Sequence, residues 1–152
     1  MKKILLIHGP NLNLLGKRDR AHYGTLTLKK VEDTVKKEAK ELGYTLQTFQ
    51  SNHEGTLIDF IQKHSEKADG ILINPGALTH YSYALHDAIL DAKIPTIEVH
   101  LSDIKMRESW RKKSVTLPAC IGQKSGKKEK SYLEAFNMLH KHLTHIDHPT
   151  HS

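Results

Sequence analysis

The chain has 152 residues, of which 38% are hydrophobic, and this is the length of one ordinary globular domain. Its longest uncharged apolar stretch, Ile4 to Ile7, is far shorter than the roughly 18 residues that a membrane span needs. We therefore expect no membrane association and a single domain over residues 1–143, followed by a polar tail over residues 144–152.

Cysteine usage and charge narrow the class of protein further. The single Cys120 excludes an intramolecular disulfide and a zinc site built from several thiolates, so a reducing, cytoplasmic location fits best. The net charge of +6 favours an anionic partner, which leaves nucleic acid, phosphate or a small carboxylate open. Because the basic clusters are not interleaved with aromatic residues, nucleic acid is the weaker interpretation and we expect no binding to it.

The first half of the chain alternates strand and helix patterns. The apolar run Lys3 to His8 predicts a strand buried on both faces, ended by Gly9. From Leu28 the apolar residues step by three or four, with Thr27 placed to cap the helix and Gly43 to stop it. The same alternation continues along the chain with an expected strand over 45–49, a helix over 57–67, a strand over 70–74, a helix over 82–92 and a strand over 96–101.

The second half predicts a short helix over 107–113, a fifth strand over 115–121 interrupted by Pro118, and a final helix over 131–143. Strands separated by helices imply right-handed crossovers and a parallel sheet covered on both faces. The predicted fold class is therefore α/β, a flavodoxin-like three-layer sandwich with a five-stranded parallel sheet.

The C-terminal residues are rich in histidine. From His140 onward they carry five of the twelve histidines of the chain. Their spacing allows adventitious capture of a metal, but we favour a frayed polar tail.

Polar residues follow four of the expected strands, where a parallel sheet binds its ligand. These are His8 to Asn13, Gln50 to Glu54, Asn74 to Gly76, and Glu98 to Ser102. The segment from Gly9 to Gly16 has neither of the glycine spacings that hold phosphates, and its Pro and Leu residues suit a backbone cradle poorly. No residue pattern therefore supports a nucleotide or flavin site, although the fold is compatible with one.

Several separated motifs together resemble the type II 3-dehydroquinate dehydratases. They are Ile7-His8-Gly9-Pro10-Asn11-Leu12-Asn13-Leu14-Leu15-Gly16-Lys17-Arg18, Tyr23-Gly24, Gln50-Ser51-Asn52-His53-Glu54-Gly55, Asn74-Pro75-Gly76-Ala77-Leu78-Thr79-His80 and Ile97-Glu98-Val99-His100. The resemblance covers roughly residues 3 to 125 and implies a hydro-lyase of the shikimate pathway, with 3-dehydroquinate as its small-molecule substrate and an enolate intermediate.

The resemblance also implies roles for individual residues. Tyr23 corresponds to the base, and because a tyrosine has an ordinary pKa near 10, it needs a cation such as Arg18 beside it. His100 corresponds to the donor that protonates the departing hydroxyl, and Glu98, two residues earlier, would share its face and orient it. Asn11 would position a water molecule or donate toward the enolate oxygen, as a neutral group. From the residues alone, each of these also fits an ordinary packing or surface role.

Substrate binding is carried over from the same resemblance. The corresponding residues are Asn74, His80, Asp87, Leu101, Ser102 and Arg111. Asp87 corresponds to a residue contributed across a subunit boundary, and the implied assembly is a homo-oligomer, a dodecamer of four trimers. The resemblance implies no metal and no cofactor. We expect His8, His53 and His86 to be structural.

The chain departs from the pattern after Cys120. Residues 122–130 are more basic than the apolar, glycine-rich stretch usual in this family. The change includes none of the residues that correspond to catalytic or substrate-binding positions, but it makes the expected packing between subunits less secure. A flavodoxin-like nucleotide or flavin binder, a basic nucleic-acid-binding protein and a non-catalytic relative are the alternatives.

Overall fold

The computed structural model describes residues 1–19, 21 and 25–147. Five parallel strands form one sheet with the order β2-β1-β3-β4-β5. The strands are β1 (Lys2–His8), β2 (Tyr44–Gln50), β3 (Gly70–Asn74), β4 (Thr96–Val99) and β5 (Gly122–Lys124). The order, with β1 between β2 and β3, is that of flavodoxin-like folds, and it confirms the predicted fold class.

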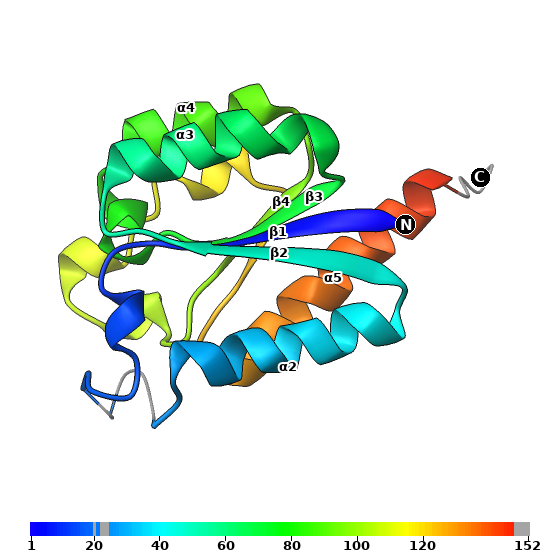
Figure 1. Cartoon of the computed structure of the whole chain (residues 1–152). Coiled ribbons are helices and arrows are strands. Elements are labelled where there is room, and N and C mark those ends of the chain that lie inside the picture. The colour runs from blue at the N-terminus through cyan, green and yellow to red at the C-terminus, as the bar shows by residue number, and fades with distance from the viewer. Residues whose placement is uncertain (20, 22–24, 148–152) are drawn as a thin grey trace.

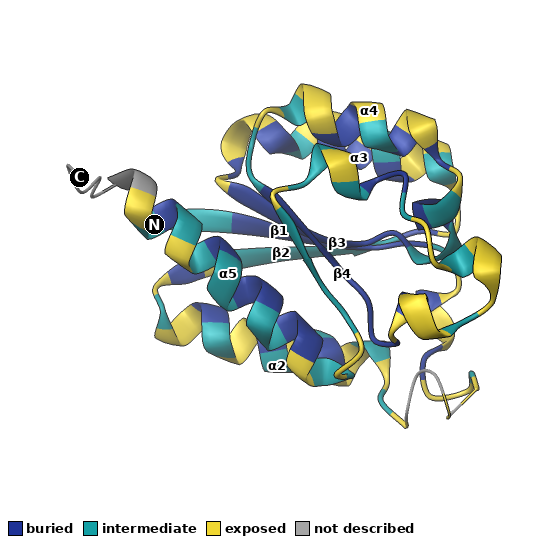
Figure 2. Cartoon of the chain, turned by 180° about the vertical axis from the view of Figure 1, so that it is seen from behind, coloured by how far each residue is buried: buried dark blue, intermediate teal, exposed yellow. Residues whose placement is uncertain are grey.

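In the described part of the chain, four helices cover the two faces of the sheet. They are α2 (Leu28–Glu41), α3 (Glu54–His64), α4 (Tyr83–Ala92) and α5 (Glu129–Asp147). Helices α3 and α4 lie on one face, and α2 and α5 lie on the other (Figure 1). Figure 2 shows the buried strands between these two layers. Each face has its own hydrophobic core, so the central strands β1 and β3 are buried on both sides, as their continuous apolar runs predicted.

Helix α2 shows how local sequence sets the boundaries of an element. The Thr27 side chain accepts a hydrogen bond from the Lys30 N–H at 3.2 Å, which caps the helix start as predicted. Val31, Val35 and Ala39 form its buried stripe. The helix ends before Gly43, whose φ of +83° is the left-handed conformation expected of a residue that terminates a helix.

Two segments after β4 differ from the prediction. The expected helix over 107–113 is reduced to a short 3-10 turn, η5 (Ser109–Arg111). The expected strand over 115–121 is wrong, because this segment contains the 3-10 turn η6 (Leu117–Ala119), and β5 begins at Gly122. Pro118, within that turn, has no N–H to donate to a strand ladder. The helix α5 extends from Glu129 to Asp147, beyond the expected end at Leu143, so the first residues of the proposed tail are helical.

Within the described part of the chain, no helix has the length and apolar character required to cross a membrane.

Candidate active site

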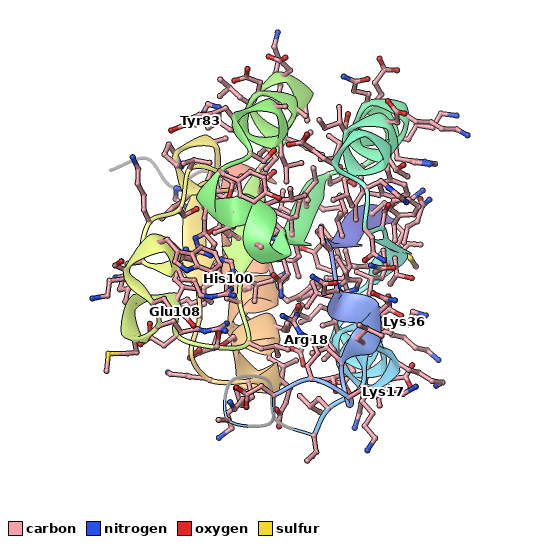
Figure 3. The ribbon with its side chains drawn as sticks, turned by 90° about the vertical axis from the view of Figure 1, so that its left-hand side faces the viewer. Lys17, Arg18, Lys36, Tyr83, His100 and Glu108 are labelled. Carbon is pink, nitrogen blue, oxygen red and sulfur yellow. The ribbon has the colours of Figure 1, made fainter. Side chains whose placement is uncertain are left out.

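A pocket lies at the carboxyl ends of β1, β3 and β4, the edge of the sheet where this fold binds ligands. Figure 3 looks onto this edge, with the labelled His100 and Arg18 both on it. The lining residues are Pro10, Asn11, Leu12, Arg18, Asn74, Gly76, Ala77, His80, His100, Leu101, Ser102, Ile104, Arg107 and Arg111. The pocket thus brings together most of the residues that the sequence singled out.

Two predicted site residues that the structure describes do not line this pocket. Glu98 is completely buried behind His100. Asp87 lies on α4, where its side chain is 72% exposed and its Oδ1 lies 3.0 Å from Nδ1 of His86. Tyr23 lies outside the described residues.

Glycines allow the loops that follow β1 and β3 to approach each other closely. A Cβ at Gly9 would lie 2.3 Å from the carbonyl oxygen of Pro75, and a Cβ at Gly76 would lie 2.9 Å from that of Pro10. Both separations are too short for a side chain. The close approach brings Asn11 and Asn74 into the lining of one pocket.

Asn11 adopts a left-handed conformation, with φ of 70°, at the start of the turn η1 (Leu12–Leu14). Asparagine tolerates this conformation better than most residues. Its backbone N–H donates to Oδ1 of Asn52, at 2.9 Å, which ties the loop after β1 to the loop after β2. The Asn11 side chain itself lines the pocket as a neutral hydrogen-bonding group.

His100 and Glu98 form a buried pair at the end of β4. Nε2 of His100 donates to Oε2 of Glu98 at 3.0 Å, so Nδ1 is the ring nitrogen left to face a ligand. His100 is only 5% exposed, and it forms part of the pocket wall. The predicted sharing of one face by these two residues is confirmed.

The Glu98 carboxylate accepts further hydrogen bonds from behind. Gln123 on β5 donates its side-chain N–H at 2.6 Å, and the hydroxyls of Ser114, at 3.0 Å, and Thr116 also donate. Burial acts to raise the pKa of Glu98, but the hydrogen bond and charge of His100 lower it, together with the hydrogen bonds from Thr116 and Gln123. The net effect is a lowered pKa of Glu98, so Glu98 is an anion that orients His100 by accepting its Nε2–H.

His80, in the turn η3 (Gly76–His80), presents a hydrogen-bond acceptor to the pocket. Its Nδ1 lies 2.7 Å from the carbonyl oxygen of Lys113 and must donate to it. Burial lowers the pKa of His80, and the hydrogen bond to the Lys113 carbonyl raises it. The charges of His100 and Arg111 add to the lowering, and the net direction is downward. The ring is therefore neutral near pH 7, with Nε2 free of a proton and able to accept a hydrogen bond from a hydroxyl group.

Three guanidinium groups, from Arg18, Arg107 and Arg111, line the pocket. Arg111 lies over the ring of Trp110, 4.0 Å from its centroid, and its Nε lies 2.7 Å from Oε2 of Glu108. The sequence reasoning did not assign Arg107, although its guanidinium is nearly buried and Nη1 lies 3.4 Å from the Ser102 hydroxyl. Three permanent cations around a small polar pocket fit an anionic ligand such as a carboxylate.

The family profile described as "Dehydroquinase class II" matches residues 2–140. The chain belongs to the class II dehydroquinase family. It is 55% identical over 142 residues to a 3-dehydroquinate dehydratase of Clostridium perfringens, with 93% of this chain and 97% of the relative covered. A second relative of the same name, from Caldicellulosiruptor bescii, is 55% identical over 140 residues, covering 91% of this chain and 97% of its own.

A solved structure supports the same assignment. The type II dehydroquinase from Butyrivibrio crossotus superposes with a TM-score of 0.89 at 45% identity, over 91% of this chain and 97% of its own. The family that the sequence motifs suggested is thus confirmed.

Among the described residues, no group of three or more His, Cys, Asp or Glu side chains is arranged to hold a metal ion. The polar groups of the described lining residues are guanidinium, imidazole, amide and hydroxyl groups, and the Glu98 carboxylate lies behind His100. Such a set favours proton transfer and the binding of an anion.

Proposed function

We propose that this protein is a type II 3-dehydroquinate dehydratase, which removes water from 3-dehydroquinate to give 3-dehydroshikimate in the shikimate pathway. The observation that carries this proposal is the buried His100–Glu98 pair on the wall of a pocket lined by three guanidinium groups. An oriented histidine suits proton donation to a leaving hydroxyl, and the guanidinium groups suit the substrate's carboxylate.

The first chemical step would form an enolate. Tyr23, as a phenolate, would accept a proton from the carbon beside the ketone, and the electron pair of that C–H bond would move onto the ketone oxygen. A tyrosine with its ordinary pKa of about 10 is neutral at pH 7, so this role needs a nearby cation, and Arg18 is the candidate. Asn11 would donate a hydrogen bond toward the enolate oxygen.

The second step would expel the hydroxyl group on the next carbon. The enolate electrons would form the carbon–carbon double bond and break the bond to the hydroxyl, while His100 gives its proton to the departing oxygen to form water. The Glu98 carboxylate would assist this step by holding the ring through Nε2, so that Nδ1 is the nitrogen that faces the departing oxygen.

The remaining pocket residues would hold the substrate. Backbone N–H groups of Leu101 and Ser102 and the guanidinium of Arg111 would bind the carboxylate, while His80 and Asn74 would bind ring hydroxyls. These residues place the reacting carbon near base and acid.

We further propose a cytoplasmic dodecamer of four trimers in which Asp87 completes a neighbouring subunit's pocket. Asp87 is exposed and does not line the pocket of its own chain. Tyr83 and Leu90 on the same helix are 64% and 56% exposed, an apolar surface suited to an interface. Light scattering on the purified protein tests the assembly, and a fully active monomer would contradict it.

The activity is tested by mixing chelator-treated protein with 3-dehydroquinate and following ultraviolet absorbance, because the product enone absorbs where the substrate does not. A prompt rise in absorbance is expected, and no rise in folded, assembled protein would refute the dehydratase proposal.

Tyr23→Phe should abolish most turnover while ligand binding stays measurable, since one hydroxyl is removed. Near-normal turnover of that variant would refute the role of Tyr23 as base.

A further inference from the structure

The Asn74 side chain is held at both ends of its amide group. Its Oδ1 accepts a hydrogen bond from the Gly76 N–H at 3.1 Å, and its Nδ2 donates to the hydroxyl oxygen of Tyr132 at 3.0 Å. Asn74 lines the pocket, whereas Tyr132 belongs to α5 and is completely buried. A contact deep in the interior therefore fixes a group on the pocket wall.

The Tyr132 side chain is buried in a hydrophobic layer. Tyr132 belongs to the core cluster between the sheet and helices α2 and α5, where a hydroxyl without a hydrogen bond would be costly. Burial raises the pKa of Tyr132, so the group is a neutral hydroxyl at any pH at which the protein works. A tyrosine here instead of phenylalanine puts a polar atom against Asn74.

The two contacts define one orientation of the amide. If the Asn74 amide were flipped, its NH₂ group would face the Gly76 N–H, and two donors would oppose each other. In the observed orientation, each end of the amide keeps one site for another partner, because Nδ2 has a second hydrogen and Oδ1 a second lone pair. A ligand in the pocket would meet an amide whose donor and acceptor are already in place.

We propose that Tyr132 is a positioning residue of the pocket, which acts on the substrate through Asn74. The proposal rests on the proposed function in that the substrate is taken to be 3-dehydroquinate. Because Asn74 is assigned to substrate holding, misplacing its amide weakens binding and leaves the chemical groups His100 and Arg18 untouched.

The test is Tyr132→Phe, which keeps the ring and deletes only the hydroxyl. We expect kcat/KM for 3-dehydroquinate to fall about 3- to 10-fold, mainly through a higher KM, which is the usual range for one hydrogen bond. Tyr44→Phe is the matched control. Tyr44 lies in the same hydrophobic layer, is 7% exposed, and its hydroxyl pairs with Nδ1 of His140 at 2.8 Å, but it does not line the pocket.

Loss of packing alone would affect both tyrosine variants alike, so an unchanged KM in Tyr132→Phe, or an equal rise of KM in Tyr44→Phe, overturns the proposal.

A double-mutant cycle with Asn74→Ala adds a sharper readout. If Tyr132 acts through Asn74, Tyr132→Phe should have no further effect on KM once Asn74 is truncated. Additive effects would overturn the proposal.

A crystal structure of Tyr132→Phe separates this inference from the proposed function. We expect the Asn74 amide to change its torsion or to occupy two orientations, and an unchanged amide would refute the positioning role whatever the protein's substrate. Conversely, if the wild-type protein fails to convert 3-dehydroquinate while the amide moves in the variant, the proposed function fails and the positioning role stands.

Discussion

Glu98→Gln tests whether the buried carboxylate contributes charge to the reaction or only shape. The glutamine side chain has nearly the same size as the glutamate that it replaces. Its oxygen can still accept hydrogen bonds from His100 and Gln123, and its NH₂ group can donate to the hydroxyl groups that donate to Glu98 in the wild-type protein. A hydrogen bond to a charged group contributes about 1.5–3 kcal/mol and a neutral one about 1 kcal/mol, so the bond that holds the His100 ring in place is weakened by about 1–2 kcal/mol. Because each 1.36 kcal/mol changes a rate tenfold, kcat should fall about 5- to 30-fold.

The measurement is kcat from enone absorbance at saturating 3-dehydroquinate, with circular dichroism to show that the variant is folded. Glu32→Gln is the matched control, because Oε2 of Glu32 lies 3.1 Å from Nε2 of the buried His8 and neither residue lines the pocket. It should lose stability but keep its kcat. If kcat of Glu98→Gln stays within about twofold of the wild-type value, the barrier has changed by less than about half a kcal/mol. That result would refute a contribution of the Glu98 charge to the reaction.

Three further predictions concern stability and reactivity. Gly9→Ala should destabilise the fold by about 1–3 kcal/mol in urea unfolding, because its Cβ would strike the backbone of residue 75. Gly55→Ala, in open space on α3, should instead stabilise the fold by about 0.5–1 kcal/mol. Equal effects of the two substitutions would contradict the steric argument. Because burial, followed by the charge of Glu98, raises the pKa of Cys120, a disulfide reagent should label its thiol slowly in the native protein at pH 8 and rapidly in guanidinium. Because the pKa of Glu98 is lower in the folded protein than its value of about 4.5 in the unfolded chain, the ionised carboxylate stabilises the fold above pH 4.5. This stabilisation should be lost as the pH falls below 4.5. In thermal melts, Glu98→Gln should therefore lose less stability on acidification than the wild-type protein.

The sequence predicts those parts of the fold whose signals are local. The helix over residues 28–41 follows from its apolar spacing and cap, and the central strands follow from continuous apolar runs. The fifth strand was predicted wrongly because Val115 and Ile121 have strand propensity, while the intervening turn positions Thr116 to donate to Glu98. A tertiary contact here outweighed local preference.

The candidate site was predictable to the extent that it follows strand ends. Glu98 and His100 are two residues apart, and the period of a strand places them on one face. Arg107 was missed, although its position four residues before Arg111 in a basic segment is a usable signal. The contact between Asn74 and Tyr132 joins residues 58 positions apart and has no local signature, so only the folded structure reveals it.

The residues that hold the pocket's side chains in place come from a different part of the chain than the residues that line the pocket. The described lining residues all lie between Pro10 and Arg111, yet Glu98 is held by donors at 114, 116 and 123, and Asn74 is held by Tyr132. The unusually basic segment 122–130 lies within this supporting region. Within it, Lys128 donates from Nζ to the carbonyl oxygen of Ala21, three residues after Arg18, at 3.2 Å. Gln123 and the more distant Tyr132 are constrained by the pocket residues that they hold.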